Sequence, residues 1–361
     1  MSESAPGPSS GARGQSEPAP ILKVENLKKH YPLRGGVFGG TIGSVRAVDG
    51  VSFELREGET LGLVGESGCG KSTLGRTILR LEDPTAGRVH FNGRDLASAS
   101  GAELKQLRRD IQMIFQDPYS SLNPRMTVGE IVREPLIVHR IGTREEQIEK
   151  VRELLETVGL TGEMLDRYPH EFSGGQRQRI GIARALALDP RLVIADEPVS
   201  ALDVSVQSQV LNLMIRLQRE RGLTYLFISH DLSVVEHVSD TIAIMYLGRL
   251  VEVGPVEAVF RRAAHPYTRA LIEAIPLPDP RQRQEAAPVR GETPSAMAPP
   301  PGCPFHPRCP FAIDECKKVV PALEPLEGAV VSAGGPSDAR EPEVGRVTSL
   351  HLAACIRKGE I

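Results

Sequence analysis

The sequence of 361 residues contains no tryptophan, and aromatic residues make up only 4% of it. A platform on which nucleic-acid bases could stack is therefore not expected. Basic residues are not in excess either, because 43 lysines and arginines are balanced by 46 aspartates and glutamates, for a net charge of -3. Without a general basic field, we expect no nucleic-acid partner.

Long apolar runs are also missing. No stretch approaches the roughly 18 apolar residues that a membrane span requires. Residues 1–20 are rich in Ser, Gly, Pro and Ala and lack the apolar centre of a secretion signal, so we predict a disordered tail there. The chain is then expected to stay in the cytosol, where its five cysteines indicate free thiols or metal ligands rather than disulfides.

Short apolar segments alternate with segments of helical spacing from about Ile21 to Arg262. Strands are predicted at 21–24, 51–55, 60–64, 111–115, 192–195, 223–228, 241–245 and 249–253. Helices are predicted at 71–80, 127–139, 144–158, 174–188 and 204–220, with Pro135 expected to end or bend the second of them. The glycine-rich residues 34–44 are expected to form an extended loop. This alternation predicts an α/β fold with a largely parallel sheet and ligand loops at the strand ends.

A phosphate-binding loop occupies residues 65–72, between a predicted strand and a predicted helix. Its glycines let backbone N–H groups converge on phosphate oxygens, and the helix adds the positive end of its dipole. Lys71 is expected to reach the β- and γ-phosphates and Ser72 to coordinate Mg²⁺. Cys69 is interpreted as a small residue that the loop tolerates. The predicted nucleotide contacts are Gly65, Glu66, Ser67, Gly68, Cys69, Gly70, Lys71, Ser72 and Thr73.

Two acidic residues, Asp196 and Glu197, directly follow the apolar strand 192–195. Beside a phosphate loop, Asp196 is expected to hold Mg²⁺, directly or through water. Glu197 is the expected general base for a water molecule that attacks the γ-phosphate.

A second glycine-rich turn, at residues 172–179, also opens a predicted helix. One ATP molecule does not need two such cradles from one subunit, so the pair of motifs predicts that the chain is half of a sandwich.

The order of these motifs resembles the ATP-binding subunit of an ABC transporter over about Ile21 to Arg262. Gln116 matches the glutamine loop of that family, residues 173–176 match its signature, with Phe172 where Leu is commoner, and residues 200–203 match the loop that crosses its dimer interface. His230 matches the switch histidine, and Tyr31 stands where the family stacks an aromatic ring on adenine. The resemblance adds further nucleotide contacts: Tyr31, Gln116, Ser173, Gly174, Gly175, Gln176, Asp203 and His230.

Each carried-over residue has a role by resemblance. Gln116 offers an amide oxygen to Mg²⁺ from a loop that faces the permease, and His230 contacts the γ-phosphate and orients the attacking water. The catalytic set is then Glu197, His230 and Gln116, and the Mg²⁺ set is Ser72, Gln116 and Asp196. The start of the signature helix would bind the γ-phosphate of ATP held by another subunit.

The composition changes after Arg262, and we predict a C-terminal module at 263–361 behind the ATPase domain at 21–262. Residues 265–271 and 302–310 resemble the tail of dipeptide and oligopeptide importer ATPases, and residues 115–125 are similar to the F-type branch of that group. The implied partners are two integral membrane permeases, a second, D-type ATPase and an extracytoplasmic substrate-binding protein, at the cytoplasmic face of the cell membrane. Relatives also carry nickel, sugars or glutathione, so the cargo is the weakest implication.

Four of the five cysteines lie in this module, as C-x5-C-x6-C-x38-C. Four thiolates can hold a [4Fe–4S] cluster or a tetrahedral Zn²⁺. The spacing lacks the C-x2-C pairs of structural zinc sites, and relatives with clusters are reported, so we favour the cluster; four free thiols are the third alternative. The predicted ligands are Cys303, Cys309, Cys316 and Cys355.

Two other classes of protein share parts of this pattern. Soluble ABC ATPases that act on ribosomes or DNA usually carry two cassettes or a long coiled-coil insertion, and this chain has neither. A free-standing P-loop kinase or GTPase is disfavoured by the signature at Ser173 and by the lack of a guanine-specificity motif.

Overall fold

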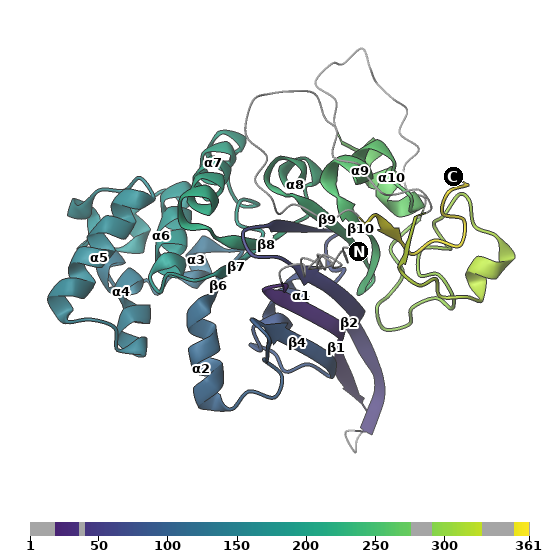
Figure 1. Ribbon diagram of the computed structural model, residues 1–361, viewed down its shortest axis with the longest axis horizontal. Coiled ribbons are helices and arrows are strands. Elements are labelled where there is room, and N and C mark those ends of the chain that lie inside the picture. The colour runs from purple at the N-terminus through teal and green to yellow at the C-terminus, as the bar shows by residue number, and fades with distance from the viewer. Residues whose placement is uncertain (1–18, 36–39, 276–290, 327–349, 361) are drawn as a thin grey trace, which may run out of the picture.

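The computed structural model describes residues 19–35, 40–275, 291–326 and 350–360 (Figure 1). The predicted tail at 1–20 lies outside these ranges except for its last two residues. None of the described helices is long and apolar enough to span a membrane.

The main sheet has eight strands in the order β11-β12-β10-β9-β3-β8-β7-β6. The five strands from β9 to β6 run parallel, whereas β10, β12 and β11 are added antiparallel at the other edge. The sheet is therefore mixed around a parallel centre, as the α/β prediction requires. Its strands are β3 (Thr60–Val64), β6 (Ile111–Ile114), β7 (Leu192–Asp196), β8 (Thr224–Ser229), β9 (Thr241–Tyr246), β10 (Arg249–Pro255), β11 (Glu324–Pro325) and β12 (Leu352–Ala353).

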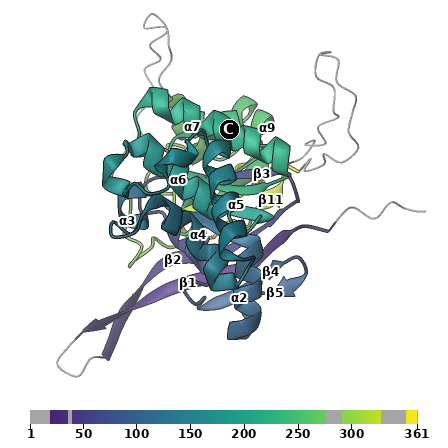
Figure 2. The same ribbon diagram turned by 90° about the vertical axis from the view of Figure 1, so that its left-hand side faces the viewer.

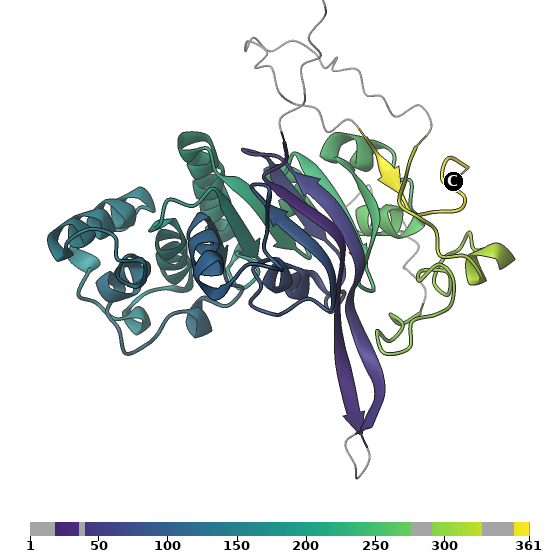
Figure 3. The ribbon, with the colours of Figure 1, turned by 60° about the horizontal axis from the view of Figure 1, so that its bottom comes forward.

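A second, antiparallel sheet has the order β2-β1-β4-β5. It consists of β1 (Leu22–Gly35), β2 (Gly40–Leu55), β4 (Ala86–Phe91) and β5 (Arg94–Asp95). β1 and β2 form a long hairpin that projects beyond the rest of the molecule (Figure 3). The loop predicted at 34–44 is therefore wrong for the described part of that range, since residues 40–44 pair with β1. Glycine weakens a strand but leaves its backbone free to pair, and the pairing continues outward from the register of Tyr31 with Val45.

The helices cover the main sheet and form a group at one end of it (Figures 1 and 2). Those of the end group, α4, α5 and α6, each begin with a reciprocal capping box, at Thr127, Thr143 and Ser173. α4 continues through Pro135, so the proline does not end it; the buried side chains of the helix hold it across the missing hydrogen bond. The helices are α1 (Lys71–Ile78), α2 (Gly101–Asp110), α3 (Pro118–Ser121), α4 (Val128–His139), α5 (Arg144–Thr157), α6 (Gly174–Leu186), α7 (Val204–Arg221), α8 (Leu232–Val238), α9 (Val256–Arg261) and α10 (Pro266–Glu273).

Side chains of the parallel strands alternate between two cores, one on each face of the main sheet. On β8, Tyr225 and Phe227 pack with the helices α4 to α7, whereas Leu226 and Ile228 pack with α1 and the second sheet. This is the two-residue period of a strand buried on both faces. Because β3, β7 and β8 are parallel, the loops that follow them emerge at one edge, which places the phosphate loop beside the loops that carry Glu197 and His230.

The described residues after 290 lie beside β10 and α10 (Figure 1). β12 pairs with β10, and Phe305, which is 1% exposed, belongs to the same core as α4 to α7. This part of the chain is thus packed onto the main sheet.

Candidate functional site

The phosphate loop joins β3 to α1 in a shape that requires glycine. Gly68 and Gly70 have φ values of 80° and 108°, and a Cβ atom at Gly70 would lie 1.9 Å from the carbonyl oxygen of Ala47. Lys71 is 4% exposed, and its Nζ donates to the carbonyl oxygens of Gly65 at 2.7 Å and Glu66 at 3.1 Å. The loop therefore presents a nearly buried cation at the start of a helix, which is the chemistry expected of a polyphosphate site.

Ser72, the first residue after that lysine, reaches the acidic residue at the end of β7. Its hydroxyl donates to Oδ1 of Asp196 at 2.8 Å. Asp196 is 1% exposed, and its Oδ2 has no hydrogen-bond partner among the described residues. Burial raises the pKa of Asp196. A buried carboxylate oxygen without a partner, next to a hydroxyl, is a donor set that suits Mg²⁺.

Two of the predicted catalytic residues, Gln116 and His230, contact the same carboxylate oxygen of Glu197. The amide Nε2 of Gln116 donates to Oε2 at 3.0 Å, and Nδ1 of His230 lies 3.1 Å from the same atom. Glu197 has a φ of 46°, which strains a non-glycine residue, and its backbone N–H donates to Ile228 of β8. The predicted catalytic residues are therefore brought together. The nitrogen of Gln116 faces Glu197, whereas its oxygen was expected to face the metal.

Tyr31 lies on β1, which packs against α1. Its hydroxyl donates to the carboxylate of Glu82, and Nζ of Lys29 lies 4.9 Å from the ring centroid. The hydrogen bond to Glu82 thus orients the Tyr31 ring, and Lys29 makes a cation–π contact with it.

The signature residues form a second group, away from the phosphate loop. Ser173 caps α6 by accepting from the N–H of Gln176, and Asp203 caps α7 by accepting from the N–H of Val206. The two helix starts approach closely, since a Cβ atom at Gly175 would lie 2.3 Å from Val206. α6 packs against α4, α5 and α7, whereas α1 packs against β1, β2 and β7.

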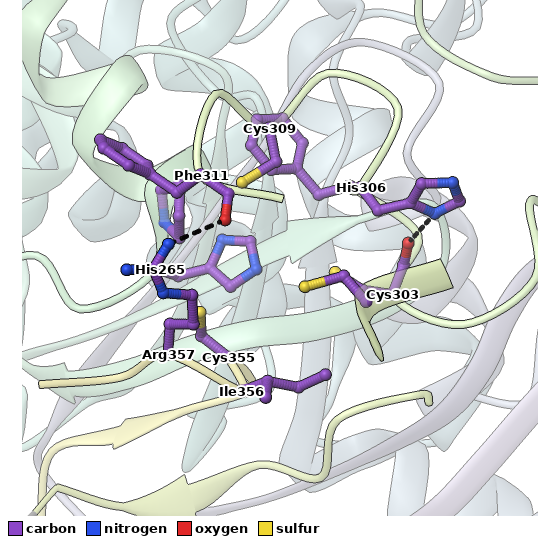
Figure 4. Close-up of a pocket in the computed structure, with 11 residues that line it drawn as sticks. His265, Cys303, His306, Cys309, Phe311, Cys355, Ile356 and Arg357 are labelled. Atoms are coloured by element: carbon purple, nitrogen blue, oxygen red, sulfur yellow. Dashed lines mark hydrogen bonds between the residues drawn. The ribbon is translucent and has the colours of Figure 1, made fainter. Parts of the chain in front are cut away.

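The four C-terminal cysteines line one small cavity of about 20 Å³, which we call the thiol pocket (Figure 4). Figure 4 shows Cys303, Cys309 and Cys355 on different sides of this pocket, and Cys316 also lines it. Burial raises the pKa of Cys303 to about 11. Across the described ranges, no group of three or more His, Cys, Asp or Glu side chains has the arrangement of a metal site.

The residues that hold Glu66 of the phosphate loop were not predicted, because no sequence motif marks them. Arg308 and Thr293 donate to its carboxylate, and its backbone N–H donates to the hydroxyl of Tyr267 at 3.0 Å. Burial would raise the pKa of Glu66, but the hydrogen bonds from Arg308 and Thr293 outweigh it and hold the pKa below its usual value. Arg308 stands next to Cys309, and only the fold connects it to the loop.

Comparison with known families and proteins gives concordant matches. The profile of the ABC transporter family matches residues 48–200, and that of the oligopeptide/dipeptide transporter C-terminal region matches residues 251–316. A "Probable peptide ABC transporter ATP-binding protein y4tS" of Sinorhizobium fredii is 53% identical over 342 residues, which cover 94% of this chain and 97% of that protein. The "Oligopeptide transport ATP-binding protein AppF" of Bacillus subtilis is 55% identical over 307 residues, which cover 84% and 93% of the two chains.

Solved structures also resemble the fold. The dimeric, post-hydrolysis structure of the ATP-binding cassette MJ0796, bound to ADP and Pi, matches with a TM-score of 0.59 and 31% identity. The match covers 65% of this chain and 99% of that one. The cbiO1 protein from Clostridium perfringens, part of the transporter complex cbiONQ, matches with a TM-score of 0.58 and 29% identity over 68% of this chain and 92% of that one.

Proposed function

The chain belongs to the ABC transporter family, in the group of peptide transport ATP-binding proteins, and from this membership we propose its role in the cell. It is an ABC-type ATPase that uses ATP and Mg²⁺ and energises peptide import through membrane permeases. The observation that carries this function is the match of peptide transport ATP-binding proteins over 93–97% of their own length. The convergence of Gln116 and His230 on Glu197 supports hydrolysis.

We propose that Glu197 takes the proton from the attacking water. A general base must lie within hydrogen-bond reach of the water, and the convergence of Gln116 and His230 on one oxygen of Glu197 supports a water site beside that oxygen. His230 is then placed to orient the water and to contact the γ-phosphate, and Gln116 to report the state of the site to the permease.

Ser72 and Asp196 are proposed as the residues that hold Mg²⁺. Bound Mg²⁺ neutralises charge that develops on the β- and γ-phosphates. The hydrogen bond between Ser72 and Asp196 aligns a hydroxyl and a carboxylate oxygen, and Oδ2 of Asp196, which has no partner in the described part of the chain, supplies a further acceptor. Lys71 and the loop N–H groups bind the phosphates, and the ring of Tyr31 stacks on adenine.

The two separate groups of site residues support a composite site. We propose that ATP on the phosphate loop is closed by residues 173–176 of a second ATPase, with Asp203 at the interface, and that this partner is the related D-type subunit. The complex would contain two permeases and receive peptide from an extracytoplasmic binding protein, so the chain would sit at the cytoplasmic face of the membrane.

We also propose that residues 21–262 form the ATPase domain and that residues 263–361 are an addition characteristic of peptide transporters.

For the thiol pocket we propose a [4Fe–4S] cluster, with Zn²⁺ as the alternative. Four cysteines around one pocket form the donor set that either group uses. The sulfur atoms would have to draw closer together than they are here, since the described residues show no metal-binding arrangement.

Co-purification tests the proposed role. The full-length chain, tagged and isolated from membranes in mild detergent, is expected to bring down two integral membrane permeases and a second ATPase. Isolation with ribosomes or DNA, and without permeases, would instead indicate a soluble ABC ATPase and contradict the proposal.

A further inference from the structure

The side chain of Glu66 points out of the phosphate loop and is held there by the C-terminal part of the chain. Arg308 binds it with both terminal nitrogens, Nη1 to Oε2 at 2.9 Å and Nη2 to Oε1 at 3.1 Å. Thr293 adds a hydrogen bond of 2.7 Å from its hydroxyl to Oε2. Paired, charge-assisted hydrogen bonds of this kind fix both distance and orientation.

Arg308 is itself held firmly. The residue is 9% exposed, and its Nη1 lies 3.4 Å from the hydroxyl of Tyr246 and 3.3 Å from that of Thr293. Phe305, three residues earlier, packs edge-on against Tyr246 with ring centroids 5.3 Å apart. These contacts already restrict the guanidinium, so little side-chain conformational entropy is lost when it binds Glu66.

The main chain of Glu66 is fixed by the same aromatic group. Its N–H donates to the hydroxyl of Tyr267, a fully buried residue of α10 whose ring lies 4.7 Å from that of Tyr246. The next residues of the loop include Gly68 and Gly70, and a glycine backbone has more conformations open to it than that of any other residue. Contacts from outside the loop are therefore a means of keeping one loop shape.

We propose that Arg308 is a positioning residue for ATP, which acts through Glu66. It holds the phosphate loop in the shape that directs Lys71 and the loop N–H groups at the phosphates. Its positive charge also neutralises the Glu66 carboxylate, which would otherwise repel a triphosphate bound to the same loop. This inference rests on the proposed ATP site and makes Thr293 and Arg308 part of the structure that supports it.

The test compares nucleotide binding by full-length variants that share the same background. MgATP is titrated into the wild type, R308Q, R308K, E66Q and the double variant R308Q/E66Q. The matched control is R357Q, because Arg357 is another arginine of the C-terminal part, and the hydrogen bonds described for it go to Phe311 and Glu360 and not to the phosphate loop. Circular dichroism without nucleotide checks that each variant is folded.

R308Q is expected to weaken ATP binding roughly tenfold, as expected for the loss of a charge-assisted pair, and R308K to weaken it less. In the assembled complex, KM for ATP should rise with little change in kcat, a pattern that general destabilisation would not produce. R357Q should bind as the wild type does. Since Arg308 acts through Glu66, the double variant should bind at least as tightly as R308Q.

Two results would overturn the proposal: R308Q that is folded and binds ATP within twofold of the wild type, or a double variant whose loss equals the sum of the single losses. Should R308Q fail to fold, R308K and E66Q make the same comparison. The variant K71A separates this proposal from the ATP site itself. If K71A loses ATP binding while R308Q does not, only the role of Arg308 is contradicted, whereas unchanged binding by K71A would contradict the ATP site.

Discussion

The hydroxyl of Ser72 donates to the carboxylate of Asp196 at 2.8 Å, across 124 positions of sequence. The contact exists because β3 and β7 flank β8 in one parallel sheet, so that the loop after β3 and the end of β7 lie at the same edge. This hydrogen bond connects the start of α1, which follows the phosphate loop, with the carboxylate that is proposed to hold Mg²⁺.

Removal of this hydroxyl is expected to weaken Mg²⁺-dependent hydrolysis. Groups that orient a metal site typically contribute 10- to 100-fold to metal affinity or activity, and Ser72→Ala should lose activity in about that range. The measurement is ATPase rate against Mg²⁺ concentration, in which S72A should need more Mg²⁺ for half-maximal rate. The control S208A removes a serine hydroxyl that donates to the carbonyl oxygen of Val204 in the same helix, α7. An unchanged Mg²⁺ requirement in S72A would contradict the metal assignment.

Substitution of Glu197 should separate binding from hydrolysis. Glu197→Gln keeps the size of the side chain and removes the base, so steady-state hydrolysis should fall by roughly 10²- to 10⁴-fold while ATP still binds. Equilibrium binding and phosphate release are measured on the same preparation. Glu57→Gln, at a surface ion pair with Arg191, serves as the control. Turnover close to that of the wild type in E197Q would remove Glu197 from its catalytic role.

The central fold was predictable because its signals are local. The apolar strand 60–64, the glycine loop and the helix from Lys71 follow one another directly, and β3 has the predicted bounds. The acidic pair at Asp196 and the histidine at 230 follow buried strands in the same way. Parallel strands place such loops together whatever their sequence separation, so the main site could be inferred.

Other features depend on contacts between distant segments, which the sequence does not specify. The hairpin of β1 and β2 is set by cross-strand register, whereas the glycine content of residues 34–44 favoured the prediction of a loop. The hydrogen bonds from Arg308 to Glu66 depend on how the described residues after 290 pack against α10 and β9. The pattern of cysteines was visible, but only the structure places all four around one pocket.

The proposed cluster makes a prediction about composition. Protein purified without oxygen should be coloured and contain iron, and Cys309→Ser should lose both, because that thiol is one of four around the pocket. Iron, zinc and visible absorbance are measured on full-length chain. Cys69→Ala is the control, since Cys69 lies in the phosphate loop. Zinc in place of iron would support the alternative, and metal-free, colourless protein would contradict both.

Acid should weaken a buried link between the two sheets. Asp49 accepts from Arg249 at 2.6 Å and lies 3.1 Å from Nε2 of His30. Burial alone would raise the pKa of Asp49, but Arg249 and His30 together hold it below its usual value. The stabilisation is therefore present above the unfolded pKa near 3.9 and is lost as the pH falls through the lower folded value.

Asp49→Asn should accordingly reduce the free energy of unfolding at pH 7 by roughly 1.5–3 kcal/mol, the range for hydrogen bonds to charged groups. The difference between D49N and the wild type should shrink as the pH is lowered below about 4. Urea unfolding at several pH values measures both. A difference that stays constant across this range would contradict the assignment.

Transport by the reconstituted complex tests the central claim most directly. The complex that contains this chain is placed in vesicles with its binding protein, ATP is supplied on the side of the ATPase, and uptake of a panel of di- and oligopeptides is measured. We predict ATP-dependent uptake of peptides by the wild type and none by the E197Q variant. Failure to take up any peptide while another class of solute is transported, or equal uptake by E197Q, would contradict the account.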